Sequence, residues 1–206
     1  MSSSRKLERV SSRGGMLLGA ILVALSAMQA QAAEPMVTGS LTSQPIGHYE
    51  FCRANPAECS VRMRDAGPAV MSGALWNTLV EVNAAVNAAI RPVNDLDLYG
   101  KDEVWAYPNG AGDCEDYVLE KRRALIDRGL SASDLLITVV RKTDGEGHAI
   151  LTVRTSKGDF VLDNLTDAVR QWDSTGYRFL KRQATNHTGQ WVAIREGQAP
   201  MVGSVE

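Results

Sequence analysis

Apolar residues in the first part of the chain recur with the period of a helix. Over residues 72–90 they are spaced by three and four positions and form one stripe, made of Leu75, Leu79, Val82, Val86 and Ile90. Pro92 follows closely, so the predicted helix ends before it. A second helix is predicted over Asp113–Arg128, because acidic residues crowd its beginning, basic residues crowd its end, and Gly129 stands where a left-handed C-cap belongs.

After the second helix the period of the apolar residues changes from helical to extended. Strand-like patterns occur in five stretches, Leu135–Lys142, His148–Thr155, Phe160–Asn164, Tyr177–Gln183 and Trp191–Arg195. A hairpin turn is predicted between the second and third stretches, at residues 156–159. Helices followed by a run of strands predict an α+β fold with an antiparallel sheet. The polar stretch Asn94–Gly112 is predicted to be a long loop, and such loops often carry function.

The two ends of the chain are predicted to lie outside this fold. Residues 1–32 combine a basic start, a short apolar run at Met16–Ala27 and the small-x-small site Ala30-Gln31-Ala32, a pattern typical of a secretory signal peptide. The apolar run is shorter than the ~20 residues of a membrane-spanning helix. We therefore expect an exported, periplasmic protein with a flexible lead-in at residues 33–45, one domain over residues 46–196 and a frayed tail at residues 197–206.

Composition and charge narrow the classes of partner. The 206 residues are enough for one domain with a sizeable core. Lys and Arg together number 22 against 24 Asp and Glu, which gives a net charge of -2. This balance does not indicate binding to nucleic acid or to an anionic membrane surface. The expected substrate is a small molecule or a polypeptide.

The expected export affects how the three cysteines, Cys52, Cys59 and Cys114, are interpreted. In an oxidising compartment they allow one disulfide and one unpaired thiol. Cys52 and Cys59 flank the turn-prone Asn55-Pro56 and are predicted to pair, which leaves Cys114 free. Cys114 could be a buried structural thiol, but the neighbouring acids Asp113, Glu115 and Asp116 do not suit an apolar core.

Cys114 lies in the first turn of the second predicted helix, where free backbone N–H groups favour a thiolate and a developing oxyanion. A nucleophilic cysteine needs a base and a group that orients the base. Of the three histidines, His148 begins a strand after a Gly-rich turn. Asp163 on the next strand is the candidate orienting acid. A turn centred on residues 157 and 158 gives these two side chains one face but leaves them about 13 Å apart, so contact requires a shift by an even number of residues.

Several short motifs make the chain resemble the bacterial transglutaminase-like cysteine peptidase family, whose best-known members are periplasmic LapG-type proteases that cut large surface adhesins. The resemblance runs from about Ile46 to Ile194 and rests on FCRANPAEC, VNAAVN, the segment Trp105–Pro108, GDCEDY, GHAILTVRT, GDFVLDN and RQATNHTGQW. It implies a papain-like or transglutaminase-like core, with the nucleophile helix packed on an antiparallel sheet. It also implies Cys114 as nucleophile, His148 as base, Asp163 as orienting acid and, for LapG-type members, calcium held by Asp113 and Glu115.

A calcium site here has a physical basis beyond the resemblance. Carboxylates on one helical turn, after a loop rich in Asp and backbone carbonyls, suit a hard cation that takes six to eight oxygen ligands. The alternative is that Asp113, Glu115 and Asp116 only stabilise the helix N-terminus, at about 0.3 to 1 kcal/mol each. Asp116 could also pair with a basic residue. Trp105, in the long loop, is a candidate for substrate binding.

The leading functional hypothesis is an exported cysteine endopeptidase that acts on a protein substrate through Cys114, His148 and Asp163. The LapG-type resemblance adds a surface adhesin as substrate and a membrane-bound inhibitor as regulatory partner. If an amine intercepted the acyl-enzyme, the same site would be a transglutaminase. A third alternative is a non-catalytic binding module on the same fold.

Overall fold

The computed structural model describes residues 34–195. The predicted signal peptide at residues 1–32 and the predicted tail at residues 197–206 lie outside the described residues. Within residues 34–195, no helix is both long enough and apolar enough to cross a membrane.

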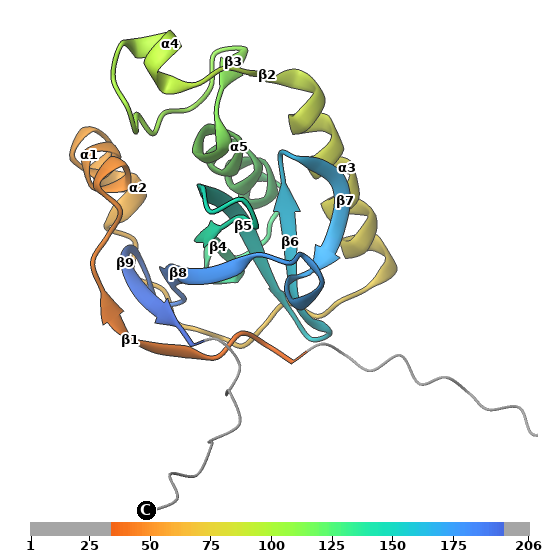
Figure 1. Ribbon diagram of the computed structural model, residues 1–206. Coiled ribbons are helices and arrows are strands. Elements are labelled where there is room, and N and C mark those ends of the chain that lie inside the picture. The colour runs from red at the N-terminus through yellow and green to blue at the C-terminus, as the bar shows by residue number, and fades with distance from the viewer. Residues whose placement is uncertain (1–33, 196–206) are drawn as a thin grey trace, which may run out of the picture. The chain divides into compact units, whose positions relative to one another are not determined.

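One antiparallel sheet organises the described part of the chain (Figure 1). Its seven strands lie in the order β1-β9-β8-β4-β5-β6-β7. Their bounds are Thr38–Thr42 (β1), Leu135–Arg141 (β4), Gly147–Thr155 (β5), Gly158–Asp163 (β6), Thr166–Gln171 (β7), Arg178–Ala184 (β8) and His187–Ile194 (β9). Strands β4 to β6 consist almost wholly of buried residues because both of their faces are covered.

The two predicted helices cover one face of the sheet. They are α3 (Gly73–Ala89), whose N-cap Ser72 side chain accepts the Leu75 N–H, and α5 (Cys114–Asp127). Figure 1 shows α5 against β4 and β5, with α3 beside it over β7. The main core forms between these helices and the sheet, from residues such as Leu79, Leu125 and Leu151. Gly129 follows α5 with a φ of 91°, as the predicted C-cap requires.

The opposite face of the sheet carries a second, smaller core. Val140, Ile150, Val161, Phe179 and Ile194 meet there, and Met36 from the N-terminal segment packs onto them. The Met36 N–H donates to Asp159 Oδ2 at 2.9 Å, and β1 pairs with β9. The expectation of a flexible lead-in at residues 33–45 is therefore wrong for β1. This short polar strand is held by backbone bonds at the sheet edge, which its composition does not reveal.

Two other segments differ from the sequence-based expectation. The predicted loop at 94–112 contains the short helix α4 (Asp95–Tyr99) and the strand β3 (Ala111–Gly112), which pairs in parallel with β2 (Arg91–Pro92). Strand β7 was missed because its sequence, TDAVRQ, is mostly polar. It lies at the sheet edge, where only one neighbouring strand pairs with it and polar side chains can face solvent.

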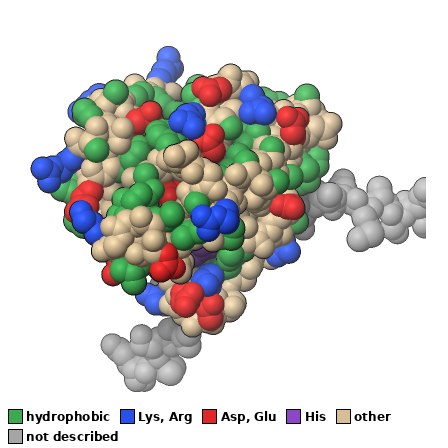
Figure 2. Space-filling model, turned by 90° about the horizontal axis from the view of Figure 1, so that it is seen from above, with side chains coloured by type: hydrophobic (Ala, Val, Ile, Leu, Met, Phe, Trp, Pro, Cys, Tyr) green, Lys and Arg blue, Asp and Glu red, His purple; other side chains and the backbone are tan. Residues whose placement is uncertain are grey.

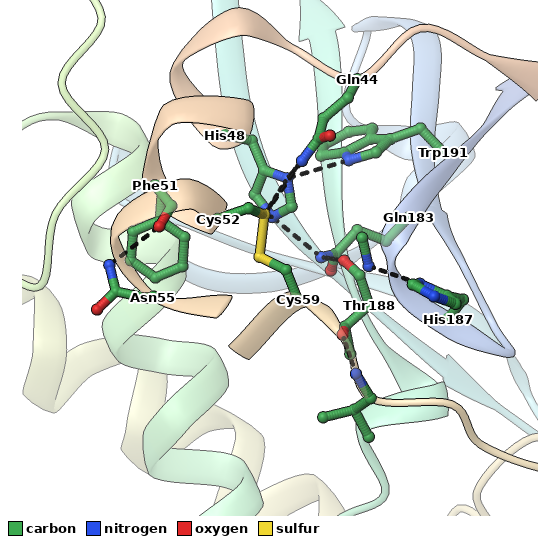
Figure 3. Close-up of a disulfide and its surroundings, with 12 residues drawn as sticks. Gln44, His48, Phe51, Cys52, Asn55, Cys59, Gln183, His187, Thr188 and Trp191 are labelled. Atoms are coloured by element: carbon green, nitrogen blue, oxygen red, sulfur yellow. Dashed lines mark hydrogen bonds between the residues drawn. A yellow bond between two sulfur atoms is a disulfide. The ribbon is translucent and has the colours of Figure 1, made fainter. Parts of the chain in front are cut away.

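The predicted disulfide between Cys52 and Cys59 is confirmed (Figure 3). It joins α1 (Ile46–Ala54) to α2 (Pro56–Cys59), two helices separated only by Asn55. His48 on α1 is 1% exposed and accepts the Trp191 indole N–H on Nδ1 at 3.3 Å. The disulfide and His48 thus belong to one buried cluster that fixes α1 against β9.

Candidate active site

Cys114 is the first residue of α5 and the one unpaired cysteine of the chain. Its thiol donates to Glu115 Oε2 at 3.1 Å, and its sulfur accepts the backbone N–H of Ala149 at 3.4 Å. Two residues before Cys114, only glycine fits at position 112, because a Cβ there would lie 2.4 Å from Asp116 Oδ2. The GDCED motif therefore packs the acids of the first turn against the chain that enters the helix.

The surroundings of Cys114 oppose ionisation of the thiol. Burial raises its pKa well above the usual value, and the charge and hydrogen bond of Glu115 raise it further, while the Ala149 N–H acts in the opposite direction. Burial and the adjacent acid therefore favour the neutral form of the thiol. Activation needs either a base that takes the proton or positive charge that offsets the acids.

His148 and Asp163 come into direct contact, with 2.9 Å between His148 Nε2 and Asp163 Oδ1. The predicted register was wrong by two residues. The turn is formed by residues 156 and 157, so Leu151 pairs with Leu162 and Thr155 pairs with Gly158. One step further along, Asp163 stands opposite Ile150, and His148 is then its diagonal neighbour, within reach of a long side chain. This is the even-numbered shift that contact required.

The Asp163 carboxylate determines the proton arrangement of the His148 ring. Burial alone would raise the pKa of Asp163, but hydrogen bonds from His148, Tyr177 and the Leu165 N–H hold it below the usual value. An ionised carboxylate can only accept. Nε2 of His148 must therefore carry a proton and donate it, which leaves Nδ1 of the neutral ring as the basic nitrogen.

A cleft at the N-terminal end of α5 brings Cys114 and His148 together. One half has a volume of about 620 Å³ and is lined mainly by polar groups, among them Arg91, Asp97 and Lys142. The other half, of about 500 Å³, has apolar walls that include Ile46, Trp105 and Val139. Cys114, Glu115, His148, Glu103 and Gly147 line both halves. A chain bound along the cleft would therefore pass directly over the sulfur and the imidazole.

Trp105 supports the apolar half of the cleft more than it projects into it. The side chain is 6% exposed and packs edge-on against His48 and Trp191 at ring distances of 5.2 and 6.4 Å. Gly47 lies so close to it that a Cβ would be 2.3 Å from the Trp105 ring. A role for Trp105 in substrate binding stays a prediction, limited to the small part of the ring that lines the cleft.

Three carboxylates form a compact group on the α4 side of Cys114. Oxygens of Asp95, Asp113 and Asp116 lie within 4.8 Å of one another. In each residue one oxygen accepts a backbone N–H, of Val104, Asp95 and Ala106 respectively. The other oxygen of each is buried without a hydrogen-bond partner. Such orphaned oxygens fit a hard cation that prefers oxygen ligands.

The charges in this group also indicate a missing counter-charge. Burial and the neighbouring Asp113 and Asp95 raise the pKa of Asp116 to about 7. The pKa of Asp95 is raised as well, first by burial and then by Asp113. On the face that carries α4 and the cleft, acidic and basic side chains are interspersed (Figure 2), and further acids line the cleft, among them Asp97, Glu103 and Glu146.

The acid group differs from the predicted ligand pair, Asp113 and Glu115. Asp113 belongs to it, and Glu115 lies beside it in a second group with Cys114. Burial and Asp113 raise the pKa of Glu115. Asp116 accepts a backbone N–H rather than serving the basic partner considered from sequence. Sequence reasoning missed Asp95, whose only signal was its place at the start of a short acidic stretch in the presumed loop.

The sequence and the structure of this chain were each compared with known proteins. The profile of the bacterial transglutaminase-like cysteine proteinases, BTLCP, matches residues 38–199. Calcium-bound LapG of Legionella pneumophila has a similar structure, with a TM-score of 0.51 and 23% identity over 62% of this chain and 74% of that chain. No curated protein matches the sequence.

Two further LapG structures from Legionella pneumophila agree with the first. One has a TM-score of 0.50 and 23% identity over 58% of this chain and 69% of that chain. The EGTA-treated form has a TM-score of 0.50 and 22% identity over 60% and 70%. At this identity the likeness shows the fold, and it confirms the predicted transglutaminase-like arrangement of a helix on an antiparallel sheet. Because the family profile spans most of the sequence, the chain belongs to the bacterial transglutaminase-like cysteine proteinases.

Proposed function

We propose that this cysteine peptidase cleaves protein substrates through Cys114, His148 and Asp163. The observation that carries the proposal is the contact between His148 Nε2 and Asp163 Oδ1, in a cleft that His148 shares with Cys114. This contact orients the imidazole and leaves Nδ1 as the base. A nucleophile, a base and an orienting group on one cleft are the parts that covalent catalysis by a thiol requires.

The residues have distinct tasks in the reaction. Nδ1 of His148 takes the proton of the Cys114 thiol, and the sulfur attacks the peptide carbonyl. The backbone N–H groups at the start of α5 have no intrahelical acceptor, so that of Cys114 can donate to the developing oxyanion. The imidazolium then protonates the leaving amine, and water activated by His148 hydrolyses the thioester. Asp163 stabilises the imidazolium throughout and keeps its orientation.

We further propose that calcium binds at Asp95, Asp113 and Asp116, with Glu115 beside them. The orphaned oxygens of the three aspartates support this, and a related protein, LapG of Legionella pneumophila, has been solved in a calcium-bound form. A bound cation supplies positive charge next to Cys114. The aspartates hold it, and their own charges then oppose formation of the thiolate less strongly.

The proposal for location and natural partners rests on the leader-like N-terminus and on the resemblance to LapG-type members. We propose an exported, periplasmic enzyme, because residues 1–32 have the pattern of a secretory signal peptide. The disulfide supports an oxidising compartment. We propose a large surface adhesin as substrate and a membrane-bound inhibitor as regulator, as in LapG-type members.

Incubation with a casein-type substrate tests the proposed reaction. The wild-type protein should produce shorter fragments, and Cys114→Ser should produce none. Fragments formed equally by Cys114→Ser would contradict the role of Cys114. Crosslinked ladders in place of fragments would show acyl transfer to amines, and absence of any reaction together with slow labelling of Cys114 would indicate a binding module.

Thermal unfolding tests the calcium site without relying on activity. The melting temperature should rise with calcium and fall with chelator, because a ligand that binds only the folded state stabilises it. Asp95→Asn should remove most of this response. Asp102→Asn, which changes an exposed acid of the same segment, is the matched control and should retain it. A melting temperature that ignores both calcium and chelator would exclude the site.

A further inference from the structure

The Asp163 carboxylate has two partners besides the histidine that a catalytic triad needs. Oδ1 lies 2.9 Å from His148 Nε2 and accepts the Leu165 N–H at 3.0 Å. Oδ2 accepts the hydroxyl of Tyr177 at 2.7 Å. Both oxygens are therefore held, and the hydroxyl is the only side-chain donor on the oxygen that faces away from the imidazole among the described contacts.

Tyr177 reaches this position because of the local backbone. It precedes β8, directly after Gly176, whose φ of 76° turns the chain out of the short 3-10 helix Trp172–Ser174. The Tyr177 ring packs against the second core and meets the His148 ring edge-on, at 5.8 Å and 73°. One side chain thus contacts both the base and the acid from the sheet face opposite α5.

We propose that Tyr177 is a positioning residue for the peptidase reaction, which fixes the Asp163 carboxylate through its hydroxyl and supports the His148 ring through its edge. The inference rests on the proposed triad. A carboxylate has a broad torsional preference about its last side-chain bond, so hydrogen bonds to Oδ1 alone leave the plane of the carboxylate free to rotate. Anchoring Oδ2 fixes the plane and keeps Oδ1 aimed at Nε2.

The charged groups around this contact are compatible with a donating hydroxyl. Burial and the adjacent Asp163 raise the pKa of Tyr177, so it remains protonated and donates. The groups that act electrostatically on Tyr177 or Asp163 from neighbouring elements are Lys121 on α5, Asp144 in the β4–β5 turn and Arg170 on β7. Lys121 is fully buried, and burial lowers its pKa to about 7 although the charge of Asp163 acts in the opposite direction.

A double-mutant cycle tests whether Tyr177 acts through Asp163. The readout is the rate at which iodoacetamide alkylates Cys114, at one pH, in the full chain with calcium present. Tyr177→Phe removes only the hydroxyl and should slow alkylation about tenfold, as expected for loss of a hydrogen bond to a charged group. In an Asp163→Ala background the same change should have no effect. Tyr49→Phe, which removes the hydroxyl of an exposed tyrosine, is the control.

A spectroscopic readout separates positioning from general stabilisation. The downfield proton resonance of His148 Nε2–H, assigned by its loss in His148→Gln, should move in Tyr177→Phe and stay in place in Tyr49→Phe. If Asp163→Ala is poorly folded, Asp163→Asn replaces it in the cycle.

Two results would overturn the inference. One is an equal slowing by Tyr177→Phe in both backgrounds, and the other is an unchanged rate and resonance. Failure of the underlying triad looks different, because Asp163→Ala and His148→Ala would then leave alkylation unchanged.

Discussion

Two histidines of this protein each lie beside a cysteine, and their surroundings assign them opposite tasks. His48 Nδ1 is 3.5 Å from Cys52 Sγ, in the cluster around the disulfide. His148 shares the cleft with Cys114. The partners of His48 Nδ1 are donors, the Trp191 indole and the Gln44 amide, whereas the partner of His148 Nε2 is an acceptor, the Asp163 carboxylate. An acceptor stabilises a protonated ring and a donor does not.

The electrostatic consequence is clearest for His48. Burial, assisted by the charge of Arg122, lowers the pKa of His48 to about 4. The ring therefore remains neutral at ordinary pH and serves as a packing element between Phe51, Trp105 and Trp191. A cysteine beside a histidine is thus not sufficient for chemistry. An acid behind the histidine and an open cleft in front of it distinguish the second pair.

Substitution of each histidine should produce the largest contrast, in activity and in stability, between the disulfide cluster around His48 and the cleft around His148. His148→Ala should lower the activity of the folded enzyme by about a thousandfold or more, as for removal of a triad base. His48→Gln should destabilise the fold and leave the activity of the folded enzyme within a few-fold of wild type. Hydrolysis of a labelled casein and urea unfolding at pH 7.5 measure both. Comparable loss of activity in the two variants would remove the distinction.

Much of the fold could be predicted from sequence because periodicity reports burial directly. The apolar stripe of α3 and the runs of β4 and β5 belong to elements that form the main core. Periodicity fails where backbone bonds rather than side chains hold a strand, as in β1 and β7. It also fails for register, because the turn depends on local bonds. Thr155 Oγ1 donates to the Gly158 carbonyl and accepts the Lys157 N–H, and Gly158 has a φ of 100°.

The candidate triad, Cys114, His148 and Asp163, was predicted from residue types, element ends and family motifs, although the register that brings His148 to Asp163 was not. Asp113, Cys114 and Glu115 form one motif, and His148 follows a Gly-rich turn. Asp95 joins the acid group from 18 residues before Asp113, and no pattern links the two. Tyr177 has a strand-like environment, which gives no sign of its contact with Asp163. Long-range polar contacts depend on tertiary structure and leave no periodic trace in the sequence.

The pH dependence of the free energy of unfolding should also distinguish His48 from His148, with an effect of about 3 kcal/mol from His48. Folded His48 takes up a proton only near pH 4, whereas the unfolded residue does so near 6.5. The unfolded state therefore binds more protons between these values, and stability falls as pH is lowered through this window. The stability that neutral His48 contributes is complete above pH 6.5 and lost near pH 4.

Urea unfolding of wild type and His48→Gln between pH 4 and 7.5 measures this contribution. The difference in unfolding free energy between the two proteins should shrink by about 3 kcal/mol toward pH 4, since 2.5 pH units correspond to roughly that amount. Other titrating groups are common to both proteins and cancel. A constant difference across this range would show that burial of His48 does not set its protonation.

Removal of the disulfide should have the smallest of these effects. The effect should be confined to the disulfide cluster around His48. In Cys52→Ala/Cys59→Ala the free energy of unfolding should fall by about 2.5 kcal/mol, the loop-closure term for a sequence separation of 7. The alkylation rate of Cys114 should change less than threefold, because Asp163 and the acids around Cys114 lie outside the α1–α2 unit. Urea unfolding and iodoacetamide kinetics provide the two measurements, and Cys114→Ser, with the disulfide intact, is the matched control for stability. A large loss of Cys114 reactivity in the double variant would mean that α1, through Ile46 and the Trp105 it supports, transmits disorder to the cleft, and the two histidine regions would then be one functional unit.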